Sequence, residues 1–177
     1  MAAWEPDDSL AHRLDYRLAA NTFVTMFWQP SLLDETTTWL RDHDYDVVIV
    51  DASGWAAPAD MHQALADALD FPDYYGNNLH ALNDCLRDVA AGDYGVGGAA
   101  TGLVLTIRNY ETFAAEQAQT AQALLDIFAV QARAAALIGR RMMCLVQSNN
   151  PKLTFGPVGA MPVVWNEAEW LDSKRQP

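Results

Sequence analysis

The chain has 177 residues, of which 51% are hydrophobic, and it carries a formal net charge of −12 with a pI near 4.4. This length is typical of one domain with a core of its own, so neither a metal ion nor a disulfide is needed to hold the fold together. An acidic surface repels nucleic-acid phosphates and attracts basic proteins over about a Debye length, so direct DNA or RNA binding is disfavoured and a basic partner is favoured.

Two cysteines and the first residues of the chain bear on the cellular compartment. Cys85 and Cys144 lie in apolar stretches, which is typical of reduced, buried thiols in a cytosol. The opening MAAWEPDD has no basic region followed by an apolar core, and no apolar run approaches the roughly 18 residues of a membrane span. We therefore expect a cytoplasmic protein with no membrane contact.

The first elements are a strand and a helix. Residues 1–20 are mixed and polar and predict no element, whereas residues 21–29, NTFVTMFWQ, are rich in β-branched and aromatic side chains and predict a strand. A helix is predicted over residues 30–43, where Ser31 and Asp34 have the spacing of a capping box.

An almost continuous apolar run follows at residues 46–53, DVVIVDAS. Such a run is typical of a strand covered on both faces in a parallel sheet, and we expect it to be the central strand. The next helix is expected to begin at Asp60, a good N-cap with Gln63 three residues later. It should end before Pro72, because proline disfavours helical geometry at the preceding residue.

A turn runs straight into a short helix at residues 72–86, PDYYGNNLHALNDCL. Gly76 can adopt backbone angles closed to other residues, and either Asn77 or Asn78 can accept a first-turn amide as the N-cap. From Leu79 on, apolar residues recur in steps of three and four, which predicts an amphipathic helix. Its expected buried side comprises Leu82, Cys85, Leu86 and Val89.

The other side of this helix is polar and carries His80, Asn83, Asp84, Arg87 and Asp88. A polar helix face is most often simply solvated. The turn favours a second interpretation, because Tyr74 and Tyr75 are adjacent and cannot both point inward in an extended segment. An exposed tyrosine beside a carboxylate-bearing helix face is typical of a protein interface.

The second half of the chain predicts two more strands around a long helical region. Residues 92–102 form a glycine-rich connection between a helix and a strand, whereas phosphate loops join a strand to a helix, so we interpret it as a flexible loop without a nucleotide. Strands over residues 103–108 and 140–148 flank an alanine-rich region at residues 110–139, which we expect to break into two helices near Thr120.

Strands that alternate with helices require crossover connections, which predicts an α/β fold with a parallel sheet and helices packed against it. The strand and helix before residue 44 would extend this sheet, and segments around Leu153 and Val164 would form an edge hairpin. No internal repeat or linker divides the chain, so we expect residues 1–177 to form a single domain.

The segment over residues 60–86, DMHQALADALDFPDYYGNNLHALNDCL, resembles the central part of the barstar family of ribonuclease inhibitors. The shared features are the D-x-H-Q helix start, the P-x-YYG-x-N-L turn and the A-L-x-D-C-L helix, and several matches at fixed spacing are more specific than one short motif. The resemblance implies a barstar-like core over about residues 44–150, extended by residues 1–43 and 151–177.

The resemblance also implies what the turn and the helix do. Family members block the active site of a ribonuclease, and the aspartate of A-L-x-D-C-L, Asp84 here, would occupy the place of a substrate phosphate. A carboxylate suits that place because it makes short, charge-assisted hydrogen bonds to basic side chains. The implied partner is a basic extracellular ribonuclease or ribonuclease toxin, bound without catalysis, cofactor or metal. The expected partner-binding residues are Tyr74, Gly76, Asn78, His80, Asn83, Asp84, Arg87 and Asp88.

Three positions depart from the family pattern. His80 stands where family members carry a second aspartate, Asn83 stands where they carry a tryptophan, and Val130 lies near the place of a glutamate from the last long helix. Asp88, one turn after Asp84, can restore negative charge on the same face. We therefore expect a cognate ribonuclease other than barnase.

Two other functional classes compete with an inhibitor. Catalysis needs converging groups, but the four histidines are far apart in the sequence: His12, His43, His62 and His80. His62, at a helix start, is better explained as a hydrogen-bonded packing residue than as a ligand, and His80 with Asp84 and Asp88 would make only a weak metal patch. An adaptor that binds a basic protein without inhibiting it would use the same surface.

Overall fold

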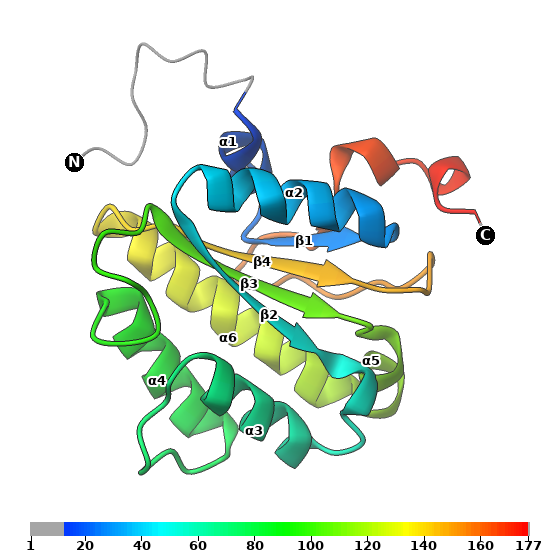
Figure 1. The fold of residues 1–177 in the computed structure, drawn as a ribbon. Helices are drawn as coiled ribbons and strands as arrows, with labels where there is room; N and C mark the ends of the chain where they lie inside the picture. Colours follow the sequence, from blue (N-terminus) through cyan, green and yellow to red (C-terminus); the bar gives the residue numbers. More distant parts are fainter. Residues whose placement is uncertain (1–12, 177) are drawn as a thin grey trace.

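The computed structural model describes residues 13–176, and a parallel β-sheet runs through the middle of this part of the chain (Figure 1). Within it the sheet has five strands in the order β2-β3-β4-β1-β5, and every neighbouring pair is parallel. The strands are β1 (Val24–Phe27), β2 (Tyr45–Asp51), β3 (Gly102–Arg108), β4 (Met142–Gln147) and β5 (Val164–Trp165). The predicted α/β class with a parallel sheet is confirmed.

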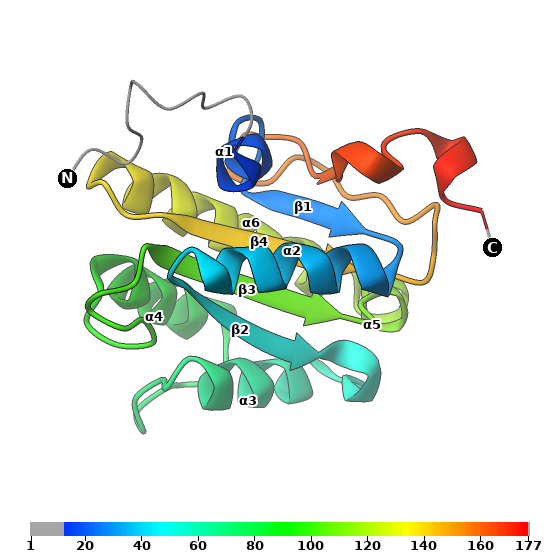
Figure 2. The same cartoon turned by 45° about the horizontal axis from the view of Figure 1, so that its top comes forward.

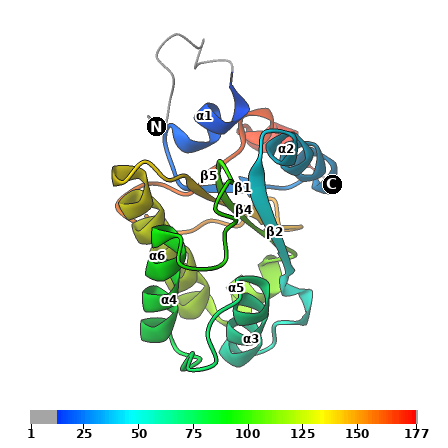
Figure 3. The same cartoon turned by 60° about the vertical axis from the view of Figure 1, so that its left-hand side comes forward.

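Helices cover both faces of the sheet (Figures 2 and 3). The helices α1 and α2 lie on one face, and α3, α4, α5 and α6 lie on the other. Their bounds are α1 (Leu14–Ala19), α2 (Pro30–Asp42), α3 (Pro58–Ala68), α4 (Leu79–Ala91), α5 (Glu111–Glu116) and α6 (Ala118–Leu137). The predicted break in the long helical region is confirmed, with Gln117 between α5 and α6.

The two faces of the sheet bury two separate apolar clusters. The larger cluster lies beneath α3 to α6 and includes Leu65, Leu86 and Phe128, while the smaller one lies beneath α1 and α2 and includes Leu33 and Leu40. Alternate residues of one strand serve the two clusters, because successive side chains of a strand point to opposite faces. The helices of the segment that resembles the family, α3 and α4, therefore pack on one side of the sheet, and α1 and α2 pack on the other.

The position of β2 corrects the expectation of a central strand. β2 is at one edge of the sheet, where Ile49 is 39% exposed, and the middle strand is β4, whose six residues are all buried. An apolar run shows that both faces of a strand are at least partly covered, and α2 and α3 do cover β2. It does not show how many hydrogen-bonded neighbours the strand has, and that number decides which strand is central.

The expected C-terminal hairpin is also wrong. Val164 and Trp165 form β5, which pairs in parallel with β1 through Thr25 and Met26, and Leu153 is in no strand. An isolated antiparallel bridge joins Val158 to Met161 instead. The C-terminal extension does lie at the edge of the sheet, but the strand to which it is hydrogen-bonded is β1, which belongs to the N-terminal extension.

Two helix starts differ from their sequence-based predictions. α3 begins at Pro58, whose fixed backbone angle suits the first helical turn, and Asp60 accepts hydrogen bonds from the amides of Ala56 and Ala57 at 2.9 and 2.8 Å. Asp60 therefore lies inside the first turn and is not the N-cap. The Asp60 carboxylate still satisfies amides at the start of α3, but it does so from the third helical position and not from the N-cap.

The predicted capping box of α2 is absent. Asp34 instead forms an ion pair with Arg108 of β3, and Gln29 at the N-cap makes no side-chain capping bond. The buried carboxylate of Glu169 accepts the amides of Trp28 and Gln29 at 2.9 and 2.7 Å, so a C-terminal residue satisfies the start of this helix. A carboxylate at this place also complements the positive end of the helix dipole.

Candidate functional site

The α4 helix is built as its sequence predicts. Asn78 is the N-cap, and its side-chain oxygen accepts the amide of Ala81 at 3.0 Å. Gly92 ends the helix in the left-handed conformation, with φ at 83°. The predicted buried side is confirmed, since Leu82, Cys85, Leu86 and Val89 are all buried. Both ends and one side of α4 are therefore fixed, which holds its polar side in a defined orientation.

The turn before α4 separates the two adjacent tyrosines. Tyr75 is partly buried, its hydroxyl lies 2.5 Å from Nδ1 of His62, and its ring packs edge-on against Phe71. Burial raises the pKa of Tyr75 and lowers the pKa of the nearly buried His62. Tyr74, in contrast, is 79% exposed. The structure thus identifies Tyr74 as the exposed member of the pair, and His62 has the packing role that the sequence indicated.

A row of charged side chains lies along the polar side of α4. The Arg87 guanidinium donates to Oδ1 of Asp84 at 3.0 Å, and its Nε lies 3.7 Å from Oδ1 of Asp88. The Asp84 and Arg87 side chains are 59% and 61% exposed, and His80, one turn earlier, is exposed as well. The Asp84 carboxylate therefore points to solvent, where a second protein can reach it.

Asn83 is tied to the neighbouring helix. Its side-chain oxygen accepts a hydrogen bond from the amide group of Gln131 of α6 at 2.9 Å, and Gln131 itself is buried. Val130, the residue before Gln131, is partly buried. The hydrogen bond from Gln131 restrains Asn83 at the boundary between α4 and α6. Asn83 is therefore partly covered, whereas Asp84 is exposed.

The glycine-rich connection after α4 is anchored at several points. Tyr94 donates its hydroxyl hydrogen to the carbonyl of Cys85 at 3.2 Å. The Gly97 amide donates to Asp46 at 2.5 Å, and the Thr101 amide donates to the carbonyl of Asp44 at 2.7 Å. The connection joins α4 to β3, as the sequence indicated, and its bonds place it against α4 and the start of β2.

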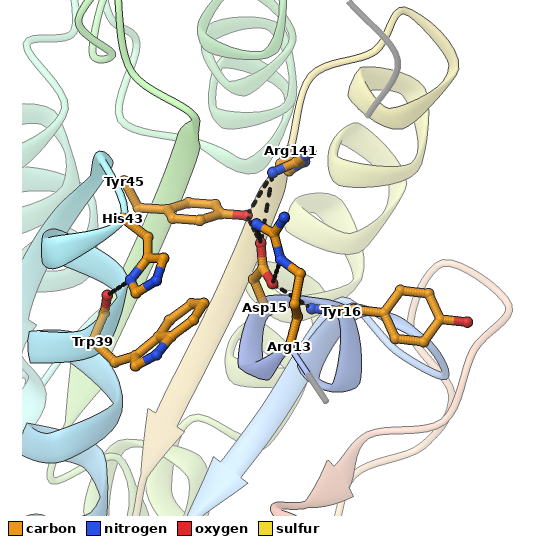
Figure 4. Close-up of polar contacts among 7 residues, drawn as sticks. All are labelled: Arg13, Asp15, Tyr16, Trp39, His43, Tyr45 and Arg141. Carbon is orange, nitrogen blue, oxygen red and sulfur yellow. Dashed lines mark hydrogen bonds and ion pairs between the residues drawn. The ribbon is translucent and has the colours of Figure 1, made fainter. Parts of the chain in front are cut away.

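A polar cluster on the opposite side of the sheet has no counterpart in the sequence predictions (Figure 4). Asp15 of α1 is fully buried, and its Oδ2 accepts a hydrogen bond from the Tyr45 hydroxyl at 2.9 Å. The same oxygen lies 3.1 Å from Nη2 of Arg13 and 3.6 Å from Nη1 of Arg141. The cluster joins α1 to the starts of β2 and β4. No local sequence pattern predicts α1, because the helix has only six residues and depends on these distant partners.

The described residues offer no metal centre and no membrane span. Among residues 13–176, no three or more His, Cys, Asp or Glu side chains are placed to hold a metal ion, so Asp84, Asp88 and His80 do not form the weak metal patch considered above. Within the same residues no helix is both long and apolar enough to cross a membrane. His12 lies outside the described residues.

Comparison with known proteins gives two matches. Residues 45–147 match the sequence profile of the family described as Barstar (barnase inhibitor), which is more than half of the chain. A Bacillus subtilis (strain 168) protein named "Putative ribonuclease inhibitor YrdF" is 39% identical over 64 residues. That alignment covers 36% of this chain and 60% of the relative's length.

Proposed function

Because this chain belongs to the barstar family, we propose that it binds a basic bacterial ribonuclease or ribonuclease toxin and blocks its active site without chemistry of its own. The observation that carries the proposal is the exposed Asp84 carboxylate on a helix fixed at both ends. The name of the Bacillus subtilis relative agrees with this role.

Asp84 is the group that would enter the active site. A ribonuclease binds the phosphates of RNA with basic side chains, and a carboxylate can take the place of one phosphate among them. Hydrogen bonds between charged partners are shorter and about twice as strong as neutral ones. The rigid attachment of α4 means that little conformational freedom is lost when the carboxylate is bound.

The turn and the rest of the α4 face would surround this contact. Tyr74 offers an exposed aromatic ring of the kind that anchors protein interfaces, and Gly76 and Asn78 bring the backbone of the turn close to the partner. The remaining members of the proposed surface are His80, Asn83, Arg87 and Asp88.

The charge of the chain would speed capture. A net charge of −12 attracts a basic enzyme before contact, so we expect the association rate to fall as salt rises. We further propose that the protein acts in the cytoplasm as a single domain, in which the family-like core carries the site. The pairing of β1 with β4 supports the single domain, because it inserts the N-terminal extension into the same sheet.

The test is inhibition of RNA cleavage by a ribonuclease that the source organism secretes or encodes beside this gene. Asp84→Ala should weaken inhibition by at least roughly 2 kcal/mol, the threshold for an interface hot spot. Asp42→Ala, which removes an exposed carboxylate from α2 on the other face of the sheet, is the matched control and should inhibit like the parent. Binding without loss of cleavage would favour an adaptor, and equal inhibition by Asp84→Ala would reject the assigned site.

A further inference from the structure

Arg87 is the only arginine or lysine among the eight residues of the proposed contact surface. It lies between the two carboxylates of the α4 face, 3.0 Å from Asp84 and 3.7 Å from Asp88. The face therefore presents a carboxylate that is already paired with a cation. This arrangement differs from a purely acidic surface, and it limits what kind of pocket the face can enter.

The stability of α4 does not require this ion pair. Both side chains are more than half exposed, and exposed ion pairs contribute little to folding because water and salt screen them. The N-cap at Asn78 and the buried apolar side already fix the helix. Fold stability thus gives no strong reason for an arginine at this position, whereas its place beside Asp84 gives it a direct influence on binding.

Arg87 has to approach the partner together with Asp84. The two residues are three positions apart on the same side of α4, so a partner that encloses the Asp84 carboxylate also meets the guanidinium. A pocket that holds RNA phosphate is lined by cations, and like charges brought together in an interface are strongly unfavourable. Binding is therefore more favourable if the partner supplies an acidic group to receive Arg87.

Ribonuclease chemistry can supply such a group. Cleavage of RNA requires a general base near the bound phosphate, and glutamate and aspartate are among the side chains that perform this role. A carboxylate base in the ribonuclease would lie beside the phosphate-binding cations. Such a pair of charges is complementary to the neighbouring Arg87 and Asp84 side chains of this chain.

We propose that Arg87 determines target specificity by requiring a carboxylate beside the phosphate-binding cations of the ribonuclease. The inference rests on the proposed inhibitory function of the α4 face. In the complex, Asp84 pairs with the cations and Arg87 pairs with the acidic group. A ribonuclease without that acidic group is bound more weakly, because the guanidinium then faces only positive charge.

The experiment is a double-mutant cycle with two probes: the ribonuclease that the parent chain inhibits in the cleavage assay above, and the same enzyme with its general-base carboxylate replaced by the corresponding amide. Binding of each probe to the parent chain and to Arg87→Ala is measured by calorimetry at low and at physiological salt. Loss of the probe's carboxylate should weaken its binding to the parent chain at least about tenfold more than its binding to Arg87→Ala. Arg41→Ala removes an exposed arginine from α2, so it controls for the same change in net charge and should behave like the parent.

The outcomes separate the inference from the function on which it rests. If the two probes respond equally to Arg87→Ala while Asp84→Ala weakens both, the role of Arg87 is refuted and the inhibitory face stands. If Asp84→Ala binds both probes like the parent, the assigned face is wrong. If the parent chain bound no ribonuclease that the source organism secretes or encodes beside this gene, both proposals would be contradicted.

Discussion

Replacing Tyr75 by phenylalanine tests whether the turn before α4 is held from within. The substitution removes only the hydroxyl that lies 2.5 Å from Nδ1 of His62, and it leaves the ring against Phe71. A hydrogen bond contributes about 0.5–1.5 kcal/mol net, but an orphaned buried polar atom costs about 1–3 kcal/mol. Because His62 is only 3% exposed, the larger range applies, and we expect the free energy of unfolding to fall by about 1–3 kcal/mol.

The adjacent tyrosine provides the matched control. Tyr74→Phe removes the same atom from a side chain that is 79% exposed, so it should change the free energy of unfolding by less than about 0.5 kcal/mol. Urea denaturation followed by far-ultraviolet circular dichroism gives both values under the same conditions. If Tyr75→Phe were no more destabilising than Tyr74→Phe, the hydrogen bond to His62 would not hold the turn, and its preorganisation would need another cause.

Three further predictions concern the rest of the scaffold. Asp15→Ala removes the buried carboxylate that accepts the Tyr45 hydroxyl and pairs with Arg141, so urea denaturation should show a loss of about 3 kcal/mol, and a loss below about 1 kcal/mol would contradict a role in holding α1. Burial lowers the pKa of His62, so the unfolded state binds its proton more readily, and the stability His62 contributes is complete above about pH 6.5 and declines as the pH falls below it. The difference in unfolding free energy between the parent and His62→Gln should therefore shrink from pH 7.5 to pH 5.5, and a constant difference would refute the assignment. Asn78→Ala removes the acceptor of the α4 N-cap and should cost about 1 kcal/mol by the same assay, with no loss if the cap is not needed.

The sequence determined the helix that carries the candidate site. The N-cap at Asn78 and the stripe from Leu82 to Val89 depend on residues only three or four positions apart, so the local pattern contains all the information needed. For the same reason the α/β class could be predicted, because alternating strand and helix patterns already require a parallel sheet. The family motif around Asp84 added the proposed chemistry of the candidate site, which periodicity alone does not provide.

Only the tertiary structure decided the features that depend on residues far apart in the chain. The apolar run of β2 fits an edge strand as well as a central one. Among the described residues β2 is an edge strand because it pairs with β3 alone. The Glu169 carboxylate at the start of α2 and the Asp15 cluster likewise join segments far apart in the sequence, and no local pattern encodes them. The contact between Tyr75 and His62 leaves Tyr74 as the exposed ring, because burial is a property of three-dimensional packing.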